Sequence, residues 1–246
     1  MKLWFREGGE GSGPRLVLIH GVGANADVWQ PLLPFIRQRW LAPDLRGHGR
    51  SPHARPYGYA VHAADVANLL EQDEEVFVVG HSMGGVVAMA LASGWFGVRV
   101  RKVLAFGVKI RWTPDEFAKM RSLAQAPARL FERREQAIER YLKVSGLFGR
   151  VDPASEMAAS GVRAEAGQWR LAADPAINAV AGPELAPVIA AMQAPLRLAA
   201  GSEDAMVSAA DMQAFDRQAR LIEGAGHNAQ VDQPAALGRL IAEELR

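Results

Sequence analysis

The pentapeptide GHSMG at residues 80–84 places a serine at a turn between two apolar runs. Residues 76–79 are rich in valine, which is typical of a buried strand, and residues 83–93 have the apolar spacing of a helix. At so sharp a strand-to-helix turn the serine side chain projects from the chain, and glycines two positions away avoid a clash. The free N–H groups at the start of the helix point to the same place. We therefore predict that Ser82 is a nucleophile, not merely a small residue in a packed turn.

A serine hydroxyl needs a base that accepts its proton, and the chain has six histidines. His227 lies between the last predicted strand and the last predicted helix, at the carboxyl edge where open α/β sheets bind their ligands. We therefore predict that His227 is the base. Among the others, we expect His20 to hydrogen-bond its own loop and His81 to point away from Ser82. Solvent or structural roles are expected for His48, His53 and His62.

A carboxylate must orient the base, and two neighbouring candidates follow the penultimate predicted strand. These are Glu203 and Asp204, of which only one can face His227. We favour Asp204, because one more residue carries the chain past the strand end to the side of the site. The competing location follows the predicted strand at residues 102–107, where the first carboxylate is Asp115.

Strands and helices alternate over most of the chain, which positions these three groups. Strands are predicted at residues 15–20, 39–43, 76–79, 102–107, 196–200 and 219–222. Helices are predicted at residues 25–38, 61–70, 83–93, 208–216 and 234–245. Continuous apolar strands that alternate with helices indicate an α/β fold with a mostly parallel, doubly wound sheet.

The alternation stops between residues 109 and 182, where the pattern is helical throughout. We predict that this stretch is a helical cap, inserted between two strands of a core formed by residues 1–108 and 183–246. Aromatic side chains of the cap are candidates to line a substrate pocket, although packing within the cap is the commoner role of any one of them. The candidates for substrate binding are Trp112, Phe131, Tyr141, Phe148 and Trp169.

Composition restricts the class of protein. With 246 residues, of which 49% are hydrophobic, the chain can bury a large core, and its net charge of +1 gives no reason to expect nucleic acid or an acidic membrane as a partner. The chain has no cysteine and its histidines are scattered, so we expect no disulfide, metal or cofactor. The amino-terminal MKLWFREGGEGSG lacks the apolar stretch of a secretory signal, and no segment approaches the roughly 20 apolar residues of a membrane span. We therefore expect a soluble cytoplasmic protein.

Several motifs together resemble the α/β-hydrolase fold family. They are the order Ser–Asp–His, the elbow GHSMGG, the early HGVG at residues 20–23 and DLRGHGRS at residues 44–51. The resemblance covers nearly all of residues 15–107 and 194–246. It implies that the backbone N–H groups of Val22 and Met83 hold the oxyanion, and that the helical insert is a cap.

The expected function is hydrolysis of a carboxylic ester of a small to medium apolar substrate through an acyl-enzyme intermediate. Family members that displace halide or open epoxides carry aspartate at the elbow, so Ser82 argues against both activities. The same triad also leaves open the hydrolysis of an enol-lactone, a carbon–carbon bond or a thioester, and cofactor-free perhydrolysis. Acyl transfer and ligand binding on a hydrolase scaffold are further alternatives.

Overall fold

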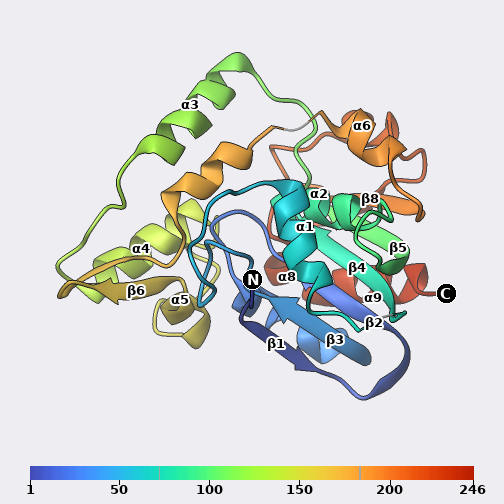
Figure 1. Ribbon diagram of the computed structural model, residues 1–246, viewed down its shortest axis with the longest axis horizontal. Helices are drawn as coiled ribbons and strands as arrows, with labels where there is room; N and C mark the ends of the chain where they lie inside the picture. Colours follow the sequence, from blue (N-terminus) through green and yellow to red (C-terminus); the bar gives the residue numbers. More distant parts are fainter. Residues whose placement is uncertain (72, 183) are drawn as a thin grey trace.

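The computed structural model describes residues 1–71, 73–182 and 184–246 and shows one large sheet covered by helices (Figure 1). Within these residues the sheet has seven strands in the order β1-β3-β2-β4-β5-β8-β9. β1 pairs antiparallel with β3 and the other pairs are parallel, which confirms the predicted α/β class. The strands are β1 (Phe5–Gly8), β2 (Gly11–Ile19), β3 (Gln38–Pro43), β4 (Glu75–His81), β5 (Arg99–Phe106), β8 (Leu196–Gly201) and β9 (Arg220–Ile222). The predicted core boundary at residue 183 lies outside the described residues.

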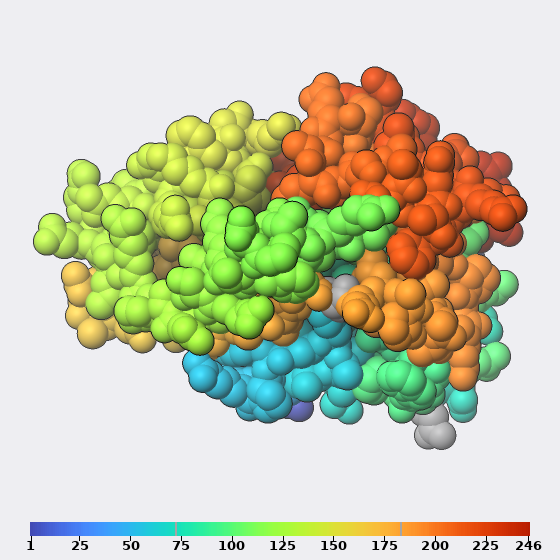
Figure 2. Space-filling view, turned by 90° about the horizontal axis from the view of Figure 1, so that it is seen from above, coloured from blue at the N-terminus to red at the C-terminus, as the bar shows by residue number. Residues whose placement is uncertain are grey.

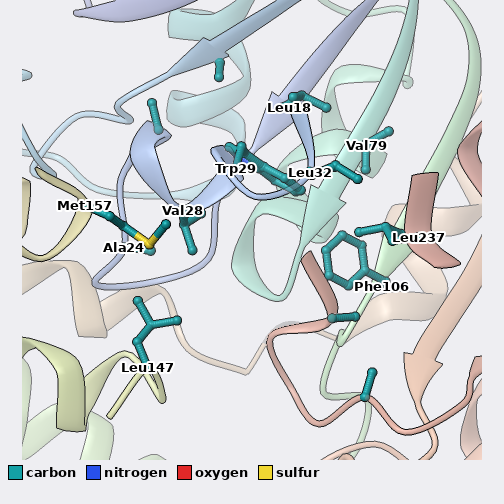
Figure 3. Close-up of a cluster of buried hydrophobic side chains, with 14 of the residues drawn as sticks. Leu18, Ala24, Val28, Trp29, Leu32, Val79, Phe106, Leu147, Met157 and Leu237 are labelled. Carbon is teal, nitrogen blue, oxygen red and sulfur yellow. The ribbon is translucent and has the colours of Figure 1, made fainter. Parts of the chain in front are cut away.

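Side chains that alternate along the strands fill two cores, one on each face of the sheet. In β2, Leu16 and Leu18 enter one core, whereas Val17 and Ile19 enter the other. Figure 3 shows the first core, in which Trp29 lies among side chains from several elements. These four side chains at the end of β2 are all buried, so this part of the strand is a continuous apolar run in the sequence.

Helices cover both faces of the sheet. On the face of Val17 lie α1 (Tyr59–Ala67), α2 (Met83–Leu91), α6 (Leu185–Ala190) and α7 (Ala209–Gln213). On the face of Leu16 lie α8 (Ala229–Asp232) and α9 (Pro234–Glu244). The predicted helices at residues 61–70, 83–93, 208–216 and 234–245 are all present with shifted ends.

The predicted helix at residues 25–38 is wrong. The structure has two short 3-10 turns there, η1 (Ala26–Trp29) and η2 (Leu33–Phe35). Pro31 and Pro34 explain the difference, because proline lacks an N–H group and its ring obstructs the preceding turn of an α-helix. The apolar residues that suggested a helix lie on these short turns instead, where Val28, Trp29 and Leu32 pack into the core.

The insert between β5 and β8 lies to one side of the sheet (Figure 1). It contains α3 (Pro114–Gln125), α4 (Arg134–Val144), α5 (Glu156–Ser160) and the 3-10 helix η3 (Pro175–Val180). The insert is not helical throughout, because β6 (Val162–Glu165) and β7 (Gln168–Leu171) form an antiparallel hairpin. Ala166 and Gly167 make its turn with φ of 50° and 81°, as a two-residue hairpin turn requires.

Candidate active site

Ser82 occupies the turn between β4 and α2 with φ 52° and ψ −119°. A non-glycine residue with positive φ is strained, and such strain persists only where the surrounding structure enforces it. The neighbouring glycines allow the close approach: a Cβ on Gly80 would lie 2.3 Å from the Gly84 oxygen, and one on Gly84 would lie 2.2 Å from the Ile19 oxygen. The elbow therefore depends on both glycines, as the sequence predicts.

His227 and Asp204 form a hydrogen-bonded pair at the carboxyl edge of the sheet. The His227 Nδ1 lies 2.8 Å from the Asp204 Oδ2, and the other carboxylate oxygen accepts the Met206 N–H at 2.9 Å. The Asp204 side chain is 1% exposed and that of His227 is 23% exposed. Glu203, the alternative carboxylate, is exposed. The structure thus brings Asp204, and not Glu203, to the predicted base.

Ser82 faces a small cavity of about 60 Å³ beneath the insert. Val22 and Met83, the two predicted oxyanion residues, line the same cavity. Within the described residues, neither backbone N–H donates to another protein group, and Ser82 makes no hydrogen bond to His227. In unliganded sites such bonds are often long and tighten only when substrate binds.

His81 is a site residue that sequence reasoning missed. Its Nε2 donates to the His227 backbone oxygen at 2.9 Å, and its ring centroid lies 4.7 Å from that of His227. Gly107, with φ 65°, leaves room for both rings, because a Cβ there would lie 3.2 Å from His81 and 3.3 Å from His227. Burial lowers the pKa of His81 well below its usual value, with a further contribution from His227. The ring is therefore neutral and links the elbow strand to the loop of the base.

The remaining histidines form no hydrogen bond to His227 or Asp204 within the described residues. His20 accepts the Leu45 N–H at 3.0 Å and contacts the Gly21 oxygen at 2.8 Å, in agreement with the predicted role in its loop. His48 and His62 are fully buried, which fits the structural one of the two predicted roles, and His53 is half-buried. Burial lowers the pKa of each ring.

The cavity receives fewer cap aromatics than predicted. Trp112 lines it, whereas Tyr141 is buried against Gly161 and Phe148 is 55% exposed. Phe131 and Trp169 pair through two backbone hydrogen bonds of 2.7 and 2.8 Å. None of these four lines the cavity of Ser82. The direction of these side chains depends on how α4 and the β6–β7 hairpin pack on the rest of the protein, which the spacing of apolar residues in the sequence does not predict.

Other residues take the places of those aromatics. From the core come Tyr59, Val86 and Val108, and from the insert come Met120 of α3 and Ile177 of η3. Lys109 also lines the cavity, and its ammonium pairs with Glu116 at 2.5 Å. The wall is thus mainly apolar, with one ion-paired lysine.

Neither a membrane span nor a metal centre is found in the described residues. No helix among them combines the length and apolar character that a bilayer crossing requires. No three or more His, Asp or Glu side chains of these residues gather as a metal ion would need.

Comparison with known proteins supports the fold along nearly the whole chain. The profile described as the alpha/beta hydrolase family matches residues 16–240. The crystal structure of E-2-(acetamidomethylene)succinate hydrolase superposes with a TM-score of 0.75 and 27% identity over 98% of this chain and 94% of that one. An esterase of Mycobacterium tuberculosis, at 23% identity, superposes with a TM-score of 0.73 over 99% and 91% and shows the same fold.

Curated relatives match over shorter stretches. Lipase LipV of Mycobacterium tuberculosis is 35% identical over 146 residues, which are 58% of this chain and 54% of the lipase. An uncharacterised protein of the same species is 45% identical over 87 residues, which are 33% of this chain and 26% of that protein. In both cases the match spans less than two thirds of the relative's length.

Proposed function

This chain belongs to the alpha/beta hydrolase family, and on that premise we propose that it is a serine hydrolase that cleaves a carboxylic ester of a small to medium apolar substrate. The observation that carries the proposal is the strained elbow of Ser82 in the same cavity as Val22 and Met83. The hydrogen-bonded pair of His227 and Asp204 supplies a base and the group that orients it.

In the proposed reaction the Ser82 oxygen attacks the ester carbonyl while His227 Nε2 accepts the serine proton. The N–H groups of Val22 and Met83 donate to the oxyanion that forms, and Asp204 stabilises the imidazolium. The protonated His227 then gives its proton to the leaving alcohol. A water molecule activated by His227 cleaves the acyl-serine and releases the acid, which returns the enzyme to its starting state.

The dimensions of the cavity support a small reacting group. A volume of about 60 Å³ holds only a few water-sized groups, whereas sites that enclose a drug-sized ligand measure roughly 300–1,000 Å³. The mainly apolar wall favours an acyl group, because each buried CH₂ contributes about 0.8 kcal/mol. Short acyl chains, of about two to six carbons, therefore fit the proposal best.

Turnover of 4-nitrophenyl acetate and butyrate tests the proposal. We expect a burst of nitrophenol as the acyl-enzyme accumulates, and no burst from the Ser82→Ala protein. Mass spectrometry of the quenched reaction should find the acyl group on the peptide that contains Ser82. A protein that binds these esters without Ser82-dependent turnover would be a binding protein on a hydrolase scaffold, and the proposal would fail.

A further inference from the structure

A second, larger cavity lies under the far end of α3. It is a hollow that is partly open to solvent, with a volume of about 550 Å³. Residues from three segments form its walls: residues 124–128 at the end of α3, residues 53–55 after β3, and residues 170–176 from the end of β7 to the start of η3. Figure 2 shows the green segment that contains α3 lying over an orange segment of the insert and beside the blue segment that follows β3.

The two cavities share two walls. α3 contributes Met120 to the cavity of Ser82 and Ala124 to the second cavity, while η3 contributes Ile177 to the first and Ala176 to the second. From residue 120 to residue 124, α3 rises roughly 6 Å. The two cavities therefore lie on neighbouring turns of α3 and of η3, which pack against each other.

Two arginines, Arg55 and Arg170, are among the polar residues that line the second cavity. Arg55 is exposed and forms no ion pair within the described ranges. Arg170 is held in place by Glu165 at 2.9 Å and by two backbone oxygens, of Leu171 and Ala173. Of the five N–H donors of a guanidinium, this leaves one on each terminal nitrogen of Arg170 free for a ligand.

Two carboxylates balance the charge of these two cations: Glu165, which pairs with Arg170, and Asp174 in the wall of the cavity. Asp174 already accepts the Tyr57 hydroxyl at 2.7 Å and the Ala176 N–H at 3.0 Å. His53 contacts the Ala172 oxygen at 2.8 Å through Nε2, and burial together with the nearby Arg163 and Arg170 lowers its pKa. The donors left for a ligand are the guanidinium of Arg55, which has no ion-pair partner among the described residues, and the two free N–H groups of Arg170.

We propose that the second cavity binds a carboxylate or phosphate group at the far end of the substrate, with Arg55 and Arg170 as its donors. This inference rests on the proposed function, because the anionic group is placed relative to an ester at Ser82. It narrows the substrate class to esters that carry an anion remote from the reacting carbonyl. A long, uncharged chain is a poor fit, because its end would enter a cavity lined by charged side chains.

Matched pairs of esters test this specificity. In the first arm, 4-nitrophenyl esters of dicarboxylic acids are compared with esters of monocarboxylic acids of equal chain length, so that the anion is on the acyl part. In the second arm, acetate esters of phosphoalkyl alcohols are compared with those of uncharged alcohols. We expect the anionic ester to have the higher kcat/KM in at least one arm, with a preference that declines as salt is added.

Variants assign the preference to the cavity. Arg55→Gln should lower the ratio of kcat/KM for the anionic and uncharged esters about tenfold, mainly through KM, and Arg55→Lys should retain most of it. Arg121→Gln is the matched control, because Arg121 lies exposed on α3 and lines neither cavity. It should leave the ratio unchanged.

The outcomes separate this inference from the proposed function. If uncharged esters are hydrolysed with Ser82 but no anionic ester is preferred in either arm, the anion site is overturned and the hydrolase remains. If no ester is hydrolysed, calorimetry of the wild-type protein with a free dicarboxylate and with an alkyl phosphate decides. If the wild-type protein binds either anion and Arg55→Gln weakens that binding about tenfold, the anion site stands. If the wild-type protein binds neither anion, the anion site is overturned.

Discussion

At the scale of single residues, the choice between two adjacent carboxylates has a direct test. Asp204 is buried against His227, whereas Glu203 is exposed. Asp204→Asn keeps the shape but removes the charge that orients the base, so kcat should fall by about 10²–10⁴-fold. Glu203→Gln should stay near the wild-type rate. Steady-state kinetics with 4-nitrophenyl butyrate measures both, and the reverse order would reassign the acid.

His81 makes a second prediction at this scale, as a positioning residue for His227. His81→Leu removes the hydrogen bond to the His227 backbone oxygen, so we expect kcat to fall about tenfold with KM nearly unchanged. His81→Gln places an amide N–H near the same oxygen and should recover part of the rate. If the His81→Leu and His81→Gln variants lower kcat equally, or if KM rises instead, the His81 side chain fills space without orienting the base.

At the scale of elements, the elbow depends on the contact between β2 and α2. Gly84→Ala would place a Cβ 2.2 Å from the Ile19 oxygen, so strand and helix would have to separate. We expect the free energy of unfolding to fall by about 3 kcal/mol, or roughly 6–12 °C in Tm. Gly58→Ala is the matched control, because its nearest atom would be the Val61 side chain at 3.8 Å, an ordinary contact. Equal Tm values for the two variants, by calorimetry, would contradict this account.

The same scale explains what the sequence could predict. The strands were predictable because runs such as residues 76–79 are apolar on both faces, and the elbow was predictable because glycines flank Ser82. The turns at residues 26–35 and the β6–β7 hairpin were not, because elements of three or four residues are too short for a period. The side-chain direction in the insert was also hidden: Tyr141 packs on Gly161, twenty positions away, instead of lining the cavity.

At the scale of the whole molecule, several buried histidines couple stability to pH. His20, His48, His62 and His81 are fully or almost fully buried, and burial lowers the pKa of each. The ring nitrogens of His62 and the Nε2 of His48 have no hydrogen-bond partner in the described part of the protein. A charge on any of these rings would be poorly compensated, so the folded state requires them neutral.

The sign of the pH dependence follows from His62, whose pKa falls from 6.5 to about 4, chiefly through burial and then through His20. Between these values the unfolded chain binds the proton and the folded one does not. The contribution of His62 to the free energy of unfolding is therefore fully present above pH 6.5 and declines as pH falls towards 4. The free energy of unfolding falls by about 3 kcal/mol across that interval because of this ring alone. His62→Leu removes the proton site and an unpartnered polar group, so its free energy of unfolding in urea should decline less between pH 6.5 and 4 than that of the wild type. Parallel curves for the two proteins would place the acid sensitivity elsewhere.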